Sequence, residues 1–199
     1  MLGRDHLISN IASVTILYTG LATVATHSDG FVGEFAAPCA QSVIDAFTVY
    51  GDLPKTAVVA LGAVLFFVGT YLPDIDNPNS RFGKVFHLPV GHRTWTHAIW
   101  FPAVVALLSI VFPPLLWLVL GYVLHLFWDS LSRGGVCWFY PISRYNKYGS
   151  GAQVKRKHPM KIYAVGETSE YILVGIIVVI ALVCLGLYLG IPFPKPVIL

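Results

Sequence analysis

The sequence predicts an all-α integral membrane protein, a bundle of about five transmembrane helices. Hydrophobic residues make up 56% of its 199 residues and charged residues only 12%, and the mean hydropathy is +0.70. These values are too apolar for a soluble domain of this length. The apolar residues also fall into runs that approach the roughly 20 residues a helix needs to cross a bilayer. Because no repeat or linker divides the chain, we expect one membrane-embedded domain over residues 1–199.

The expected helices are five apolar runs, residues 7–25, 56–72, 98–112, 114–131 and 171–190. The first run follows Arg4 and ends in small residues, as a signal peptide also does, but we expect a retained helix. The third run is short and contains Pro102, and Pro113 and Pro114 end it. The third and fourth runs should therefore form a tight helical hairpin. Residues 26–55 and 133–163 are expected to be the long loops.

Lysine and arginine predict the orientation of this bundle. Five spans put the N-terminus and the loops 73–97 and 132–170 on one side of the membrane. Eleven of the thirteen basic residues lie on that side: Arg4, Arg81, Lys84, Arg93, Arg133, Arg144, Lys147, Lys155, Arg156, Lys157 and Lys161. The positive-inside rule places this side in the cytoplasm and the C-terminus outside. We therefore expect a multi-pass protein of a bacterial-type inner (plasma) membrane.

Six side chains that could bind a metal ion lie at the ends of these apolar runs: Asp74, Asp76, His92, His97, His125 and Asp129. Carboxylates and imidazoles beside lipid are costly unless something compensates them, and a bound cation is a strong compensation. The orientation predicted from the basic residues puts all six on the cytoplasmic side, and His6 and Glu170 reach that side too. The three cysteines have no paired spacing, so neither a disulfide framework nor a zinc–thiolate site is indicated.

Each motif also has a plainer interpretation. His125 and Asp129 are four residues apart and project from one helix face, so they could chelate an ion or simply satisfy each other as a hydrogen-bonded pair. Asp74 and Asp76 follow Pro73, and such a turn is often a helix stop followed by an N-cap. The two histidines at 92 and 97 are five residues apart, so a loop or a helix start must bring both inward.

The combination of motifs resembles the YdjM-like family of membrane-bound, predicted metal-dependent hydrolases. It covers about residues 70–141, through Leu72-Pro-Asp-Ile-Asp-Asn with Ser80-Arg81, His92-Arg-Thr-Trp-Thr-His97, Gly121-Tyr-Val-Leu-His125 with Asp129-Ser-Leu, Gly135-Val and Tyr140-Pro141. More remotely, the family is similar to bacterial zinc phospholipases C and zinc nucleases. That similarity implies His125, Asp129, His97 and Asp74 as metal ligands, with His6, His158 and Glu170 as candidate additional ligands.

The implied chemistry is hydrolysis by a water molecule that a metal ion activates. Carboxylates together with imidazoles suit Zn²⁺ first, with Mn²⁺ or Fe²⁺ as alternatives. Asp76 is our candidate for the general base or for a bridging ligand, with Asp74 coordinating. Arg81, Arg93 and Arg133 flank the motifs and could grip a phosphate with two hydrogen bonds, although the positive-inside rule alone would also put arginines there. Arg93, inside the histidine motif, is the strongest of the three.

A site at the level of the lipid headgroups predicts a lipid partner, and a phosphoester or pyrophosphate of a lipid is the leading substrate class. The basic tract 155–161 fits attraction to anionic lipid or a simple orientation signal. Aromatic and basic residues interleave only over residues 138–148, so we expect no specific nucleic-acid partner. Two other classes remain: a non-catalytic membrane adaptor held together by a metal, and a metal transporter, which should carry polar residues into the outer half of its spans.

Overall fold

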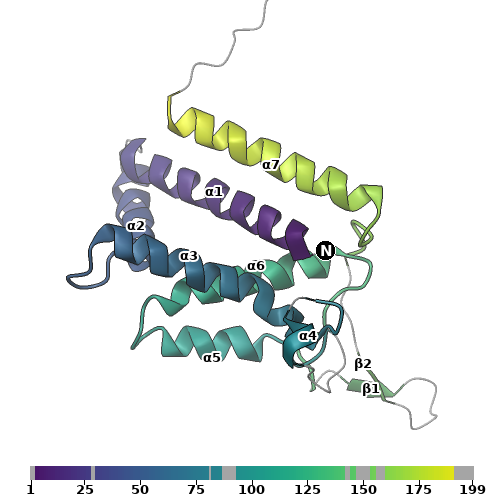
Figure 1. The fold of residues 1–199 in the computed structure, drawn as a ribbon. Helices are drawn as coiled ribbons and strands as arrows, with labels where there is room; N and C mark the ends of the chain where they lie inside the picture. The colour runs from purple at the N-terminus through teal and green to yellow at the C-terminus, as the bar shows by residue number, and fades with distance from the viewer. Residues whose placement is uncertain are drawn as a thin grey trace, which may run out of the picture.

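The structure, a computed structural model, describes residues 3–27, 30–80, 82–86, 93–141, 144–146, 153–155 and 160–190. The helices in chain order are α1 (Gly3–His27), α2 (Gly30–Thr48), α3 (Lys55–Tyr71), the 3-10 helix η1 (Leu72–Asp76), α4 (Gly83–Phe86), α5 (Trp100–Leu108), α6 (Leu115–Leu131) and α7 (Thr168–Tyr188). Helix α7 packs along α1, α3 packs along α6, and α5 lies against α6 (Figure 1).

The predicted helical membrane bundle is confirmed in outline. Among the described residues, three stretches are long and apolar enough to cross a membrane, Gly3–Thr26, Lys55–Asp76 and Thr168–Tyr188. Helix α6, with 17 residues, is slightly shorter. The number of five spans and their orientation remain predictions.

The segment 26–55, expected to be a loop, is mostly helical, so that expectation was wrong. Helix α2 occupies 19 residues of it and packs against α1. Its sequence hides the helix, because Pro38 lies inside it and Glu34 and Asp45 interrupt the apolar pattern. The backbone carbonyl of Pro38 accepts a hydrogen bond from the hydroxyl of Ser42 at 2.8 Å. Packing on α1 therefore outweighs the weak helical signal of the segment itself.

The expected third span is shorter in the structure than the run 98–112. Helix α5 has nine residues, which extend about 14 Å at 1.5 Å per residue, roughly half of the 30 Å hydrocarbon layer. The residues just before Trp100 form turns, and Pro113 and Pro114 end the segment that follows. The predicted hairpin is confirmed, because α5 packs on α6 with the rings of Phe101 and Tyr122 stacked at a centroid distance of 4.8 Å.

The all-α prediction also needs a small correction in the expected loop 133–163. Strands β1 (Arg144–Asn146) and β2 (Gln153–Lys155) pair antiparallel, with Tyr145 opposite Val154. Farther along, the backbone around Tyr163 lies beside the end of α6, where the N–H of Arg133 donates to the Tyr163 carbonyl at 2.9 Å. This pairing returns the chain to the site end of the bundle before α7 begins.

Glycines let α3 and α6 approach closely. A Cβ on Gly69 would lie 2.2 Å from the backbone oxygen of Leu118, and a Cβ on Gly121 would lie 2.5 Å from that of Phe66. Small residues at such crossings are typical of membrane helices. Helix α1 joins the crossing through Asn10, whose amide donates at 3.1 Å to the Thr70 hydroxyl and to the Gly121 carbonyl.

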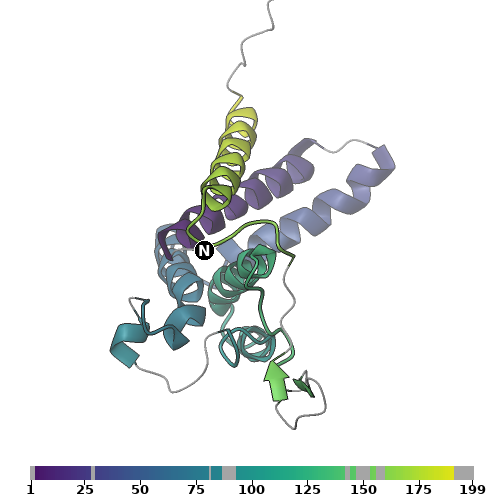
Figure 2. The ribbon, with the colours of Figure 1, turned by 90° about the vertical axis from the view of Figure 1, so that its right-hand side faces the viewer.

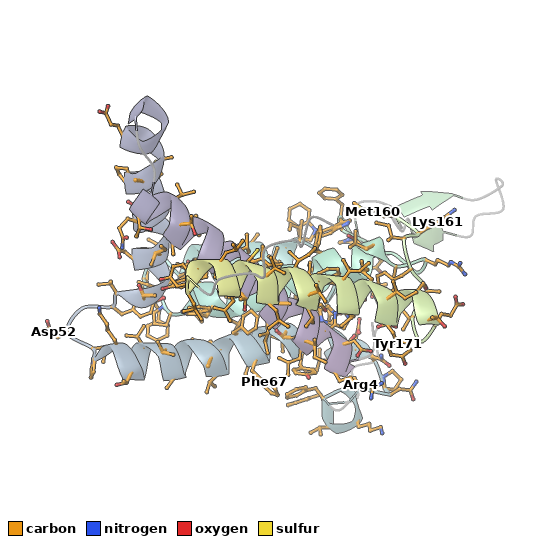
Figure 3. The ribbon with its side chains drawn as sticks, turned by 90° about the horizontal axis from the view of Figure 1, so that it is seen from above. Arg4, Asp52, Phe67, Met160, Lys161 and Tyr171 are labelled. Carbon is orange, nitrogen blue, oxygen red and sulfur yellow. The ribbon has the colours of Figure 1, made fainter. Side chains whose placement is uncertain are left out.

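Side chains labelled in Figure 3 mark the two ends of the bundle. Arg4, Lys161 and Tyr171 lie at one end, and Asp52, in the turn between α2 and α3, lies at the other (Figure 3). Seen from the first end, the start of α7 lies next to the N-terminus, and α4 and the strand pair lie on the side away from α7 (Figure 2). This is also the end at which Asp74, at the end of α3, and Asp129, in the last turn of α6, are located.

Candidate metal centre

The candidate site is assembled from four separate segments at this end. Helix α1 contributes His6, η1 contributes Asp74 and Asp76, and α6 contributes His125 and Asp129. Pro73, at the start of η1, tightens the end of α3 into a 3-10 turn that buries both aspartates. His97 comes from the turns before α5. The histidines at 6, 97 and 125 are at most 1% exposed.

Within the described part of the chain, two groups of side chains could hold a metal ion. They are His6, Asp74 and His125, and His97, His125 and Asp129, with the ligand atoms of each group within 4.8 Å of one another. Asp129 connects them, because its Oδ1 lies 3.3 Å from Nε2 of His6 and its Oδ2 lies 3.4 Å from Nε2 of His97. The rings of His6 and His125 stack at a centroid distance of 3.8 Å.

The hydrogen bonds of His125 define its free nitrogen. Its Nδ1 lies 2.7 Å from the Thr70 carbonyl, which can only accept, so Nδ1 carries the proton. In the neutral ring Nε2 then carries a lone pair and can only accept a hydrogen bond. No described group donates one to it. Nε2 instead faces two carboxylates, with Oδ1 of Asp74 at 3.8 Å and Oδ2 of Asp129 at 3.9 Å. A lone pair that faces two carboxylates calls for a cation among the three groups.

The spacing of these atoms fits a divalent ion. Bonds of about 2.0–2.2 Å to nitrogen and oxygen put neighbouring ligand atoms roughly 3.4 Å apart in a tetrahedral site. The distances from Asp129 to His6, His97 and His125 run from 3.3 to 3.9 Å. Without a metal, burial lowers the pKa of His97, but Asp129 and Asp76 outweigh it and raise the pKa to about 9. A proton on His97 then supplies part of the missing positive charge.

Asp76 contacts His97 and the backbone beside it and belongs to neither group. Its Oδ2 accepts hydrogen bonds from the Arg93 backbone N–H at 3.0 Å and from the Thr96 hydroxyl. The same oxygen lies 3.6 Å from Nδ1 of His97. Carboxylates in this position orient the histidine ligands of metal sites, so the geometry favours an orienting role for Asp76 over direct coordination.

Arg93 lies inside the site. Its backbone has φ of 61°, a left-handed conformation that is uncommon for residues other than glycine, and this turn lets both its N–H and its side chain reach inward. Nη2 donates to Oδ1 of Asp129 at 2.7 Å, and Nη1 donates to the Ser132 hydroxyl at 3.0 Å and to the Gly135 carbonyl at 3.3 Å. The guanidinium therefore holds Asp129 in place.

The remaining predicted residues divide into three sets. Arg81, His92 and His158 lie outside the described residues. Arg133 is exposed and its Nη1 lies 3.7 Å from Oε1 of Glu167, so it faces the segment before α7. Glu170 is buried, and its Oε2 accepts the Gly166 N–H at 2.6 Å. It stands outside both metal-binding groups, at the start of α7.

Sequence reasoning missed the groups that support the ligands. They are the Thr70 carbonyl, the hydroxyls of Thr96 and Ser132, and the Asn10 amide. Thr96 lies inside the histidine motif and could have been suspected from its place beside His97. A backbone carbonyl leaves no mark in a sequence, so the Thr70 contact could not have been predicted.

Comparison with known proteins places the chain in a family. The model of the family described as YdjM inner membrane protein matches residues 1–192. The chain belongs to this family. The match includes every described helix, α1 through α7, and so supports the membrane character inferred from hydropathy. No curated protein and no solved structure matches the chain. The similarity to zinc phospholipase C remains a prediction.

Proposed function

We propose that this protein is a membrane-bound, metal-dependent hydrolase. The observation that carries the proposal is the free Nε2 of His125, which faces the carboxylates of Asp74 and Asp129 with no hydrogen-bonding partner among the described residues. Buried acceptors are not left facing one another without a compensating charge. The donor set of imidazoles and carboxylates suits Zn²⁺ best, with Mn²⁺ or Fe²⁺ as alternatives.

Asp74, His125 and Asp129 would hold the ion, and His6 and His97 would be further ligands, each from one of the two groups. When bound, a divalent cation would lower the pKa of a water molecule and polarise a phosphoryl oxygen. In hydrolysis the water oxygen bonds to phosphorus and the bond from phosphorus to the leaving oxygen breaks, while a carboxylate takes the proton of the water and the leaving oxygen receives it. Asp74, 8% exposed, is better placed to meet water than Asp76, 2% exposed, so we assign the general base to Asp74.

The substrate we propose is a phosphoester or pyrophosphate of a membrane lipid. The nitrogen Nε of Arg93 is buried and lacks a partner among the described groups, although both Nη atoms are engaged. A phosphate oxygen is a strong acceptor for such a donor. Arg4 and Lys161 lie at the same end of the bundle and would attract anionic headgroups (Figure 3). With the positive-inside rule, this end faces the cytoplasm in a multi-pass topology.

One observation favours a second candidate, a non-catalytic adaptor stabilised by a metal. His6, His97, His125 and Asp129 are at most 1% exposed, and structural metal sites are closed in this way. Protein with a catalytic ion hydrolyses its substrate, whereas protein with a structural ion does not. An assay of hydrolysis therefore separates the two candidates.

The test measures metal content and hydrolysis in the same samples. Purified protein in vesicles of phosphatidylethanolamine and phosphatidylglycerol is analysed for bound metal and assayed for release of phosphate or of phosphorylated headgroup. We expect Asp74→Asn and His125→Ala to lose metal and hydrolysis together, and the control Asp52→Asn, in the distant turn, to keep both. Hydrolysis that survives loss of the metal would refute the site. Wild-type protein that holds the metal and hydrolyses neither lipid would support the adaptor.

A further inference from the structure

A large apolar cleft, open to the surroundings, lies between four helices on the far side of the bundle from Arg4. Its volume is about 480 Å³, and we call it the apolar wedge. Ile11 and Tyr18 on α1, Val43 on α2, Val59 on α3 and Trp117 on α6 are among the residues that line it. The size falls within the range of 300–1,000 Å³ typical of ligand sites.

Three polar groups of the wedge lining, on Thr15, Thr48 and Trp117, form hydrogen bonds within the protein. The hydroxyl of Thr15 donates to the Ile11 carbonyl at 3.0 Å, and that of Thr48 donates to the Ile44 carbonyl at 2.8 Å. The indole N–H of Trp117 donates to the Phe47 carbonyl at 2.8 Å. A cavity holds ordered water only where polar groups remain free to bind it. Apart from the hydroxyl of Tyr18, the lining is apolar or already hydrogen-bonded, so the wedge favours a hydrocarbon occupant.

The depth of the wedge points to the source of that hydrocarbon. Its α1 and α3 walls belong to the stretches Gly3–Thr26 and Lys55–Asp76, which are apolar enough to cross a membrane. The wall on α1 runs over eleven residues from Ile11 to Leu21, a rise of about 15 Å. That length is roughly half of the hydrocarbon layer, the depth to which one lipid chain reaches. In a membrane, this part of α1 and α3 would be surrounded by the acyl chains of the lipids.

A closely packed layer separates the wedge from the metal centre. Asn10 of α1 donates to the Thr70 hydroxyl and the Gly121 carbonyl, and a Cβ on Gly121 would lie 2.5 Å from the Phe66 carbonyl. Leu120, in the wedge wall, and His125 are five residues apart on α6, or about 8 Å along the axis. The wedge is therefore a second site, and its occupancy does not depend on the proposed hydrolysis.

We propose that the apolar wedge binds one hydrocarbon chain of a membrane phospholipid. Specific binding differs from ordinary lipid contact in one measurable respect, since a site with room for one chain saturates. The outer face of α7, with Ile172, Ile176 and Val179 exposed, provides an internal reference for unspecific contact.

The test uses phosphatidylglycerol with a diazirine on one acyl chain, in vesicles of phosphatidylethanolamine and phosphatidylglycerol. After irradiation, labelled peptides are quantified by mass spectrometry. We expect labelling of the wedge walls, residues 11–21 and 43–48, to saturate at a low fraction of probe, whereas labelling of α7 rises in proportion to the probe. Ala63→Leu, which adds three carbons inside the wedge, should lower wall labelling at least about tenfold, as extra methyl groups do in a filled pocket.

The matched control is Ala60→Leu, on an exposed position of the same helix that does not line the wedge. It should leave wall labelling unchanged, and Val43→Phe should repeat the loss from the α2 side, should Ala63→Leu fail to fold. Labelling of the wedge walls in Asp74→Asn should equal that of the wild type. Because Asp74 belongs to the candidate metal site, this variant separates lipid binding in the wedge from the proposed hydrolysis. The proposal would be overturned if labelling of the wedge walls rose in proportion to the amount of probe. It would also be overturned if neither Ala63→Leu nor Val43→Phe changed that labelling, since both results would show unspecific lipid contact only.

Discussion

The two ends of the α1, α3 and α6 assembly carry opposite chemistries, and α2 adds a fourth wall at the apolar end. At the site end, His6, Asp74 and His125 converge in a closely packed polar centre. At the other end, the helices and α2 border an open apolar wedge of about 480 Å³. Asn10 and Gly121 hold the helices together at the boundary between the two. The same helices therefore bring polar groups together at one end and line an apolar cleft at the other, because the residue types on their facing sides differ along their length.

The strongest way to break the polar end is to remove the charge of Asp129. Asp129→Asn would leave the buried Arg93 guanidinium without its carboxylate, and breaking a buried pair of this kind costs about 3–5 kcal/mol. We expect a large fall in thermal stability in detergent together with loss of bound metal. Asp45→Asn, on an exposed position of α2, is the control and should behave as the wild type. Stability equal to the wild type would contradict the role given to Arg93.

Gly121 tests the close packing of helices between the candidate metal site and the wedge. Gly121→Ala puts a methyl group against the backbone of α3, 2.5 Å from the Phe66 carbonyl, and overpacking of this kind typically costs about 1–3 kcal/mol. We expect a lower midpoint of thermal unfolding and weaker metal binding. Gly175→Ala on α7, where a Cβ meets nothing within 4 Å of the described structure, should be neutral or slightly stabilising. Equal behaviour of the two variants would show that the crossing tolerates separation.

The pH dependence of metal binding tests whether a proton substitutes for the ion. In the metal-free protein His97 has a pKa raised to about 9, so it is protonated at pH 7, and coordination requires the neutral ring. Metal affinity should therefore rise about tenfold per pH unit from pH 7 and level off above the pKa of about 9. Calorimetry in two buffers of different ionisation enthalpy should detect about one proton released per ion at pH 7. An affinity independent of pH over this range would rule out His97 as a ligand.

The smallest effect is expected at Arg133. Its exposed contact with Glu167 belongs to a class of surface ion pairs worth about 0–1 kcal/mol. Arg133→Ala should therefore lower the free energy of unfolding by less than about 1 kcal/mol and leave the rate of lipid hydrolysis nearly unchanged. Kinetics on the vesicle substrate measure this directly. A large rise in KM would instead support the prediction that Arg133 binds the substrate.

The metal centre was predicted more fully from the sequence than the wedge was. Histidine and aspartate at the ends of apolar runs are costly and therefore informative, so His97, His125, Asp74 and Asp129 could be named in advance. The wedge lining consists of ordinary apolar residues, which look the same whether they face a neighbouring helix, lipid or a cavity. Helix α2, which forms one wall of the wedge, is not predicted from the sequence, because Pro38 and two acidic residues interrupt its apolar pattern.

The sequence by itself determined the class of the protein and the end of the bundle at which its polar chemistry gathers, because transfer from water to lipid depends on composition and on position along the chain. The tertiary structure alone decided that Oδ2 of Asp76 lies 3.6 Å from Nδ1 of His97 and that Arg93 turns inward to contact Asp129. It also directs Nδ1 of His125 to the Thr70 carbonyl, so that Nε2 has no hydrogen-bonding partner among the described residues. These outcomes depend on the left-handed backbone at Arg93 and on the approach of α3 to α6. Both arise from packing between segments far apart in the chain, which no local pattern encodes.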